Sequence, residues 1–187
     1  MKIAVSGTHG SGKSTLVEDF VDAHKNFIHE PEPYEWLDDV SAEPGVDEFL
    51  QQFEISIERI GSHPKTANVI FERSPLDFLA YIESLYDLGR ASRDCELLDS
   101  VAERASHAIA QLDVLVILPL DERIDIPDSE DLELREAMNE RLLQLVASDP
   151  YALFTRTRVV EIAGTRRQRL EQIGNVLEML HRVDGLR

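Results

Sequence analysis

The chain has 187 residues, of which 43% are hydrophobic, and 36 aspartates and glutamates outnumber 19 lysines and arginines to give a net charge of −17. This composition is sufficient for one buried core, and so acidic a surface argues against a protein that binds nucleic acid or anionic membranes. Cys95 is the single cysteine, which excludes an internal disulfide, and no apolar run approaches the ~20 residues of a transmembrane helix. We therefore expect a soluble, cytoplasmic protein in which residues 1–187 form one domain.

Strand and helix patterns alternate along the chain. Five short apolar segments indicate strands, at residues 2–6, 26–30, 68–72, 113–118 and 158–162. Helical spacing of apolar residues indicates helices at residues 13–24, 46–60, 76–88, 94–112, 132–147 and 165–181. Prolines at positions 31, 33 and 44 predict an irregular segment before Val46. The alternation predicts an α/β fold, in which a parallel sheet carries helices on both faces.

A glycine-rich loop, Gly7–Ser14, lies between the first strand and the first helix and satisfies the motif G-x-x-x-x-G-K-[ST] in full. Its glycines leave room for backbone N–H groups around phosphate oxygens, and the following helix adds a partial positive charge. Lys13 supplies a charge for the β- and γ-phosphates, and the Ser14 hydroxyl is suited to Mg²⁺. Thr15 either touches the α-phosphate or only begins the helix. The loop is predicted to be a P-loop, with a phosphate site formed by Gly7, Gly10, Ser11, Gly12, Lys13, Ser14 and Thr15.

The ends of the second and third strands carry the charged residues that phosphoryl transfer needs. Glu30 ends the second strand, with Glu32 two residues further on, and Glu72 ends the third strand, directly before Arg73. In a parallel sheet both ends lie at the edge that carries the P-loop. Carboxylates can accept a proton or bind a metal, and a guanidinium can balance developing charge. These residue types are therefore sufficient for phosphoryl transfer.

The order of motifs over residues 1–90 resembles that of the deoxynucleoside kinase family of P-loop proteins. That family has a P-loop, a Glu-Pro pair near a tryptophan, a helix with a glutamine, and an Asp/Glu-Arg-Ser triplet after the third strand. The matching residues here are Glu30-Pro31 or Glu32-Pro33, Trp36, Gln51 or Gln52, and Glu72-Arg73-Ser74. The second half, through Glu161–Gly164, is more similar to the AAA-28-type group of small ATP-binding proteins. The kinase resemblance implies a P-loop NTPase sheet of five parallel strands in the order 2-3-1-4-5.

The kinase resemblance also implies catalytic roles. Glu30 would accept the proton of the acceptor hydroxyl, with Glu32 as the alternative base. Arg73 would bridge the donor phosphate and the acceptor, so that the expected catalytic residues are Lys13, Glu30 and Arg73. The expected metal ligands are Ser14 and Glu72, and the expected cofactors are ATP and Mg²⁺.

A substrate pocket is implied in the same way, with the residues Glu32, Trp36, Gln51 and Gln52. Trp36 and Phe53 would form its apolar walls, and one of the two glutamines would hydrogen-bond a base or another polar edge of the substrate. From the residues alone, Trp36 could equally belong to the core, and both glutamines could be exposed on their helix.

Kinases of this kind close an arginine-rich lid over the phosphates, and the corresponding segment here is residues 120–141. Two of its arginines, Arg123 and Arg135, are the expected lid residues, but acidic residues greatly outnumber the arginines. A lid of this charge would repel phosphate unless one of these arginines or Arg141 points inward while the acids face water. The alternative is a plain solvated acidic helix.

Three arginines follow the last predicted strand, at positions 166, 167 and 169. In related kinases this loop borders the adenine, so an arginine here could stack on the base. A solvated start of the last helix is the alternative.

The sequence thus predicts an ATP- and Mg²⁺-dependent small-molecule kinase that phosphorylates a hydroxyl of a nucleoside or similar metabolite. ATP is favoured over GTP because no Asn/Thr-Lys-x-Asp guanine-reading motif is present. The alternative is an ATP-binding regulatory P-loop protein with slow or no hydrolysis that signals through a protein partner. We expect a nucleoside-like substrate as the partner, with no nucleic acid or membrane, and a homodimer could form through the helices at 76–88 and 94–112.

Overall fold

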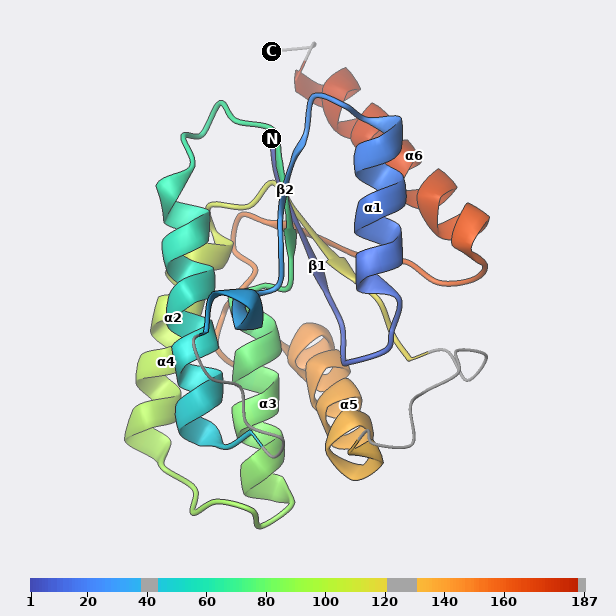
Figure 1. The fold of residues 1–187 in the computed structure, drawn as a ribbon. Coiled ribbons are helices and arrows are strands. Elements are labelled where there is room, and N and C mark those ends of the chain that lie inside the picture. The colour runs from blue at the N-terminus through green and yellow to red at the C-terminus, as the bar shows by residue number, and fades with distance from the viewer. Residues whose placement is uncertain (38–43, 121–130, 185–187) are drawn as a thin grey trace.

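The computed structural model describes residues 1–37, 44–120 and 131–184, except for the side chains of residues 181–184. In this part of the chain, five parallel strands form one sheet in the order β2-β3-β1-β4-β5 (Figure 1). The strands are β1 (Lys2–Ser6), β2 (Ile28–Glu30), β3 (Val69–Glu72), β4 (Val114–Ile117) and β5 (Arg158–Glu161). The predicted α/β fold and its strand order are confirmed.

Helices connect these strands in the predicted order. They are α1 (Lys13–Ala23), α2 (Val46–Ser62), α3 (Pro75–Asp87), α4 (Cys95–Ile109), α5 (Leu132–Ser148) and α6 (Arg166–Asp184), with a short 3₁₀ helix η1 (Pro33–Trp36) after β2. Among the residues that the structure describes, no helix combines the length and the apolar character needed to cross a membrane.

Two hydrophobic clusters cover the two faces of the sheet, because successive side chains of a strand point to opposite faces. On β1, Ala4 packs into a cluster with α2, α3, α4 and α5, whereas Ile3 and Val5 pack into a second cluster with α1 and α6. On β4, Leu115 and Val116 divide between the clusters in the same way. The sheet is therefore the middle layer of three, as Figure 1 shows.

Helix α3 is the central helix of the larger cluster and is covered by α2, α4 and α5 of the same chain. Every residue from Pro75 to Tyr86 is buried. A helix buried on all sides has no face left for a second copy of the chain. The structure therefore does not support a dimer face at this helix, and the homodimer itself stays a prediction.

The boundaries of a few elements differ from the sequence prediction. Helix α4 ends at Ile109 instead of residue 112, because Gln111 N and Leu112 N donate to carbonyls three residues back and tighten the last turn. The segment before Val46 was expected to be irregular, but it contains η1. Pro33 suits the first position of this helix because its φ is fixed and it has no N–H group to leave unbonded.

The carboxyl ends of the parallel strands meet at one edge of the sheet. The P-loop leaves β1 at this edge, Glu30 ends β2 and Glu72 ends β3. Ligands of open α/β sheets bind at this edge, next to the point where the strand order reverses, which here is β1.

Candidate functional site

The P-loop turns tightly between β1 and α1 because three of its positions require glycine. Gly10 and Gly12 have left-handed φ angles of 66° and 92°. A Cβ atom on Gly7 would lie 2.6 Å from the backbone oxygen of Leu118. The backbone N–H groups at the start of α1 border the turn, which is the arrangement that binds phosphate at a helix N-terminus.

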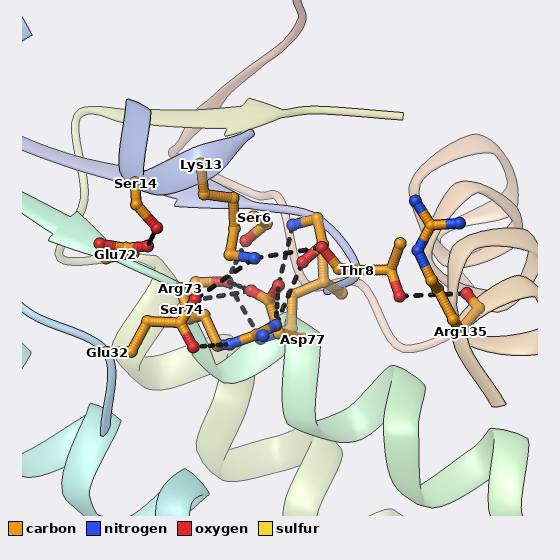
Figure 2. Close-up of polar contacts among 12 residues, drawn as sticks. Ser6, Thr8, Lys13, Ser14, Glu32, Glu72, Arg73, Ser74, Asp77 and Arg135 are labelled. Carbon is orange, nitrogen blue, oxygen red and sulfur yellow. Dashed lines mark hydrogen bonds and ion pairs between the residues drawn. The ribbon is translucent and has the colours of Figure 1, made fainter. Parts of the chain in front are cut away.

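Two arginines hold the backbone of the P-loop from outside. Arg135 of α5 donates from Nε to the His9 carbonyl at 2.8 Å, and the Thr8 hydroxyl donates back to the Arg135 carbonyl at 3.0 Å (Figure 2). Arg169 of α6 donates from Nη1 to the Ser11 carbonyl at 2.7 Å and from Nε to the Gly164 carbonyl at 2.9 Å. The loop is thus tied to helices on both faces of the sheet.

Asp77 in the first turn of α3 joins the P-loop to the end of β3. Its side chain is fully buried, and its carboxylate accepts hydrogen bonds from Gly7 N at 2.9 Å and Ser74 N at 2.8 Å (Figure 2). The same carboxylate lies 3.6 Å from Arg73 Nη1. The sequence analysis missed Asp77, although Ser74 and Asp77 form the S-x-x-[DE] pattern of a capping box, which the structure contains.

Arg73 follows β3 in a strained backbone conformation. Its φ of 73° lies in the left-handed region, which non-glycine residues rarely adopt outside functional sites. This conformation directs the guanidinium to the P-loop, where Nη1 donates to the Gly7 carbonyl at 3.1 Å. The Arg73 guanidinium also lies over the ring of Tyr81.

Lys13, Glu32 and Arg73 form one buried charge cluster beside the P-loop (Figure 2). Lys13 Nζ lies 3.3 Å from Glu32 Oε1 and donates to the Thr8 carbonyl at 3.1 Å, and Arg73 Nε donates to Glu32 Oε2 at 2.8 Å. Burial lowers the pKa of Lys13, and the nearby charge of Arg73 acts in the same direction. Burial alone would raise the pKa of Glu32, but Arg73 and Lys13 bring it down to about 2. Glu32 is therefore an ionised carboxylate held by two cations.

Glu30 has a different environment from the one expected for the base. Both of its carboxylate oxygens accept hydrogen bonds from Arg59, at 2.7 and 2.6 Å, and His63 Nε2 lies 2.7 Å from Oε1. Burial raises the pKa of Glu30, but the bonds to Arg59 and His63 bring it below its ordinary value. Both oxygens of Glu30 therefore already have hydrogen-bond partners from α2 and the residue that follows it. Of the two candidate bases, Glu32 is the one that contacts Lys13.

Ser14 and Glu72 lie together at the expected metal position. The Ser14 hydroxyl donates a hydrogen bond to Glu72 Oε1, and His29 Nε2 lies 3.5 Å from Glu72 Oε2. Within the described residues no group of three or more acidic, histidine or cysteine side chains could bind a metal by itself. One hydroxyl and one carboxylate fit Mg²⁺, because this ion commonly takes one or two protein oxygens and completes its shell with phosphates and water.

The expected substrate residues divide by exposure. Trp36 is 51% exposed, which contradicts its alternative interpretation as a core residue, and the Arg59 guanidinium lies 4.6 Å from the centre of its ring. On α2, Gln52 is buried and Gln51 is exposed. Phe53 is fully buried in the larger hydrophobic cluster, so the expectation that it forms a wall of the substrate pocket is wrong.

The lid segment is described from residue 131 onward, so Arg123 lies outside the described residues. On α5, Arg135 is buried and faces the P-loop, whereas Glu133, Glu136 and Glu140 are exposed. Arg135 Nη2 is buried without a hydrogen-bond partner among the described residues. Arg141 instead pairs with Glu83 and Asp87.

The remaining residues of interest lie on the same edge of the sheet. Thr15 is partly buried in the first turn of α1. Arg166 and Arg167 are exposed and pair with Asp19 and Glu171, so of the three arginines after β5 only Arg169 contacts the P-loop.

Glu32 is expected to make the free energy of unfolding depend on pH between its unfolded pKa of 4.5 and its folded pKa of about 2. A carboxyl group whose pKa is lowered by folding stabilises the protein above the unfolded pKa, and this stabilisation is lost as the pH falls through the folded pKa. The shift corresponds to ~3 kcal/mol of stabilisation. Denaturant titrations of the wild type and Glu32→Gln, at neutral pH and near the folded pKa, should show the larger acid-induced loss in the wild type. Equal losses would contradict this assignment.

Comparison with known proteins relates this geometry to a family. The family model AAA_28, described as an AAA domain, matches residues 2–169. No curated protein matches the chain. Solved structures that match include the deoxyadenosine kinase of M. mycoides with bound dATP, at 18% identity and a TM-score of 0.65, with 95% of this chain and 99% of that one covered.

Two further structures have similar folds. The thymidylate kinase of Candida albicans matches at 16% identity and a TM-score of 0.67, over 96% of this chain and 92% of that one. A NadR protein in complex with NAD and AMP-PNP matches at 19% identity and a TM-score of 0.63; the match covers 95% of this chain but 48% of that one. At these identities the similarity shows the fold. Since the family model covers most of the chain, and the P-loop and strand order agree with it, the chain belongs to the AAA_28 family of AAA-domain proteins and has the fold of the P-loop nucleotide kinases.

Proposed function

We propose that this protein is a kinase that transfers the γ-phosphoryl group of ATP to a hydroxyl of a nucleoside or similarly sized metabolite. The observation that carries the proposal is the contact of Glu32 with both Lys13 and Arg73 beside the P-loop. A protein that only binds a nucleotide needs Lys13 and the P-loop. A kinase also needs a group that takes the proton of the acceptor hydroxyl, and the buried Glu32 carboxylate lies close enough to the phosphate position to do so. Residues 1–187 act as one unit in this proposal.

The donor side is formed by the P-loop and the cations around it. Lys13 contacts the β- and γ-phosphates in place of its present partners, Glu32 and the Thr8 carbonyl. The backbone N–H groups from Gly10 to Thr15 surround the phosphate oxygens. Arg135 supplies Nη2, which lies 3.5 Å from the position of a Cβ on Gly10. A buried guanidinium nitrogen without a partner gains most when an anion satisfies it.

Transfer then requires a base and neutralisation of charge. The acceptor oxygen attacks the γ-phosphorus as the bond to the ADP oxygen breaks, and the hydroxyl proton passes to Glu32. Arg73 balances the charge that develops between donor and acceptor, and Lys13 balances the charge on the departing ADP. Ser14 and Glu72 would hold Mg²⁺, which supplies further neutralisation of the phosphate charge when bound.

The acceptor side of the proposed site is bordered by η1 and α2. Trp36 offers an exposed aromatic surface, and Gln52, rather than the exposed Gln51, is the glutamine that lies on the inner side of α2. A stacking surface together with an amide suits a flat, polar ring such as a nucleobase. The acidic surface of the chain favours a small-molecule substrate over nucleic acid.

The experiment that tests the proposal measures ADP release by the purified chain with MgATP and a panel of nucleosides and small hydroxylated metabolites. We expect at least one acceptor to raise ADP release and to appear as a phosphorylated product. Binding of ATP without any acceptor-dependent ADP release or phosphorylated product would contradict the kinase and support the alternative, an ATP-binding regulatory protein with slow hydrolysis. Lys13→Ala should abolish the acceptor-dependent ADP release, and substitution of Lys25, an exposed residue paired with Asp22, serves as its control for loss of a lysine.

A further inference from the structure

A cavity of about 740 Å³ lies at the edge of the sheet opposite to the P-loop. Asn68 directly precedes β3 and Asp113 directly precedes β4, so the cavity is at the amino ends of the strands. Arg158 begins β5, and Arg156 and Lys65 come from the loops beside it. The volume is within the range of ~300–1,000 Å³ that small-molecule sites occupy.

The charges that line this cavity differ from those in the rest of the chain. Lys65, Arg156 and Arg158 make no side-chain hydrogen bond or ion pair with the side chains or backbone of residues 1–37, 44–120 and 131–180. In these same ranges every other lysine and arginine side chain that the structure describes bonds a carboxylate or a backbone carbonyl. Among the described side chains, the three cations without a partner are therefore all at one cavity, although acidic residues outnumber basic ones almost twofold in the sequence.

The cavity contains little negative charge to balance these cations. Asp113 is the one acidic residue in the described part of its lining, and Asp113 Oδ2 already accepts a hydrogen bond from Lys2 N at 2.7 Å. The pKa of the Lys2 ammonium is lowered by burial and also by the charge of Lys65, whereas Asp113 raises it. Like charges thus lie close enough together to repel one another, which an anionic ligand would relieve.

We propose that this cavity is a second ligand site, distinct from the P-loop, that binds a small phosphorylated molecule through Lys65, Arg156 and Arg158. Guanidinium groups present paired N–H donors that match phosphate oxygens, and two of them together with a lysine suit a ligand with at least two negative charges. The proposal does not depend on the kinase activity.

The alternative explanation is that the three cations only stabilise the helix ends at this edge. Helix α4 ends at Ile109, directly before Ala110 and Gln111 of the cavity lining, and cations near a helix C-terminus are stabilising without any ligand. The two explanations differ in whether an anion binds here.

Pyrophosphate binding to the full chain with Lys13→Ala tests the proposal, because this background weakens the P-loop site. Calorimetry at low salt should detect one bound pyrophosphate. Arg156→Ala together with Arg158→Ala in the same background should weaken binding of pyrophosphate by ~10-fold or more, since charge-assisted hydrogen bonds from both guanidinium groups are lost. Both side chains are exposed, so the variant should fold, as circular dichroism will verify.

The matched control replaces Arg93 and Arg104 with alanine, because these exposed arginines pair with Asp87 and Glu54 away from the cavity. The control variant should bind pyrophosphate as its parent does. An equal loss of pyrophosphate affinity in the control would show that the effect comes from the change in net charge alone, and it would overturn the proposed site. A lower melting temperature of the Arg156/Arg158 variant, without pyrophosphate binding in its parent, would favour stabilisation of helix ends and also overturn it.

Discussion

Replacing Glu32 with glutamine is expected to lower the kcat of phosphoryl transfer by ~10²–10⁴-fold, which is the usual contribution of a positioned general base. The amide cannot take the proton of the acceptor hydroxyl. ATP should bind at least as tightly as in the wild type, because Lys13 loses the carboxylate with which it pairs in the structure. Steady-state kinetics of ADP release, together with ATP titration by calorimetry, separates the two effects. A loss of ATP affinity equal to the loss of kcat would instead assign Glu32 to binding.

Glu30→Gln is the matched control for this substitution. Glu30 is bonded to Arg59 and His63, so its substitution should reduce the stability of the fold while kcat changes only a few-fold. The measurements belong at a temperature at which both variants are folded. A large loss of kcat in Glu30→Gln, with little change in Glu32→Gln, would return the role of base to Glu30.

Replacing Lys13 with alanine is expected to reduce kcat/KM for ATP by ~10³-fold or more, since it removes the cation that faces the charge of the transferred group. Lys13 is buried, and its neighbours Glu32 and Arg73 retain their own bond, so the fold should remain. ATP affinity should fall as well, which distinguishes this variant from Glu32→Gln. Unchanged ATP affinity would exclude Lys13 from the phosphate site.

The fold could be predicted almost completely because its signals are local. Short apolar strands and amphipathic helices alternate in the sequence, and the P-loop motif occurs between a strand and a helix, where its mechanism requires it. The order of the strands came from a family resemblance rather than from any pattern in the residues. The 3₁₀ helix at Pro33–Trp36 was not predicted, because the prolines that begin it also indicate irregular structure.

The choice between Glu30 and Glu32 shows what the sequence could not provide. Both lie at the carboxyl end of the same strand, each precedes a proline, and both are acidic. Which of them contacts Lys13 depends on the turn into the unpredicted η1 and on Arg59 and His63, which contact Glu30 from ~30 residues further along the chain. Contacts between residues so far apart leave no pattern in a single sequence.

The lid arginine illustrates the same limit. The excess of acids in residues 120–141 predicted repulsion of phosphate, but charge counts ignore direction. In the described part of this segment the acids of α5 face water and Arg135 faces the P-loop. A helix separates its two faces, so a net charge summed along its length says little about either face.

The arginines that bond the P-loop carbonyls have a consequence for the thermodynamics of nucleotide binding. Fixing the backbone of one residue costs ~1–2 kcal/mol in conformational entropy. If a flexible glycine-rich loop became ordered only on binding phosphate, this cost would lower the affinity of the protein for the nucleotide. Here Arg135 and Arg169 bond the His9 and Ser11 carbonyls, so contacts within the folded chain already fix the loop. Most of that entropy is lost when the chain folds, and the free energy of the phosphate contacts remains available for affinity.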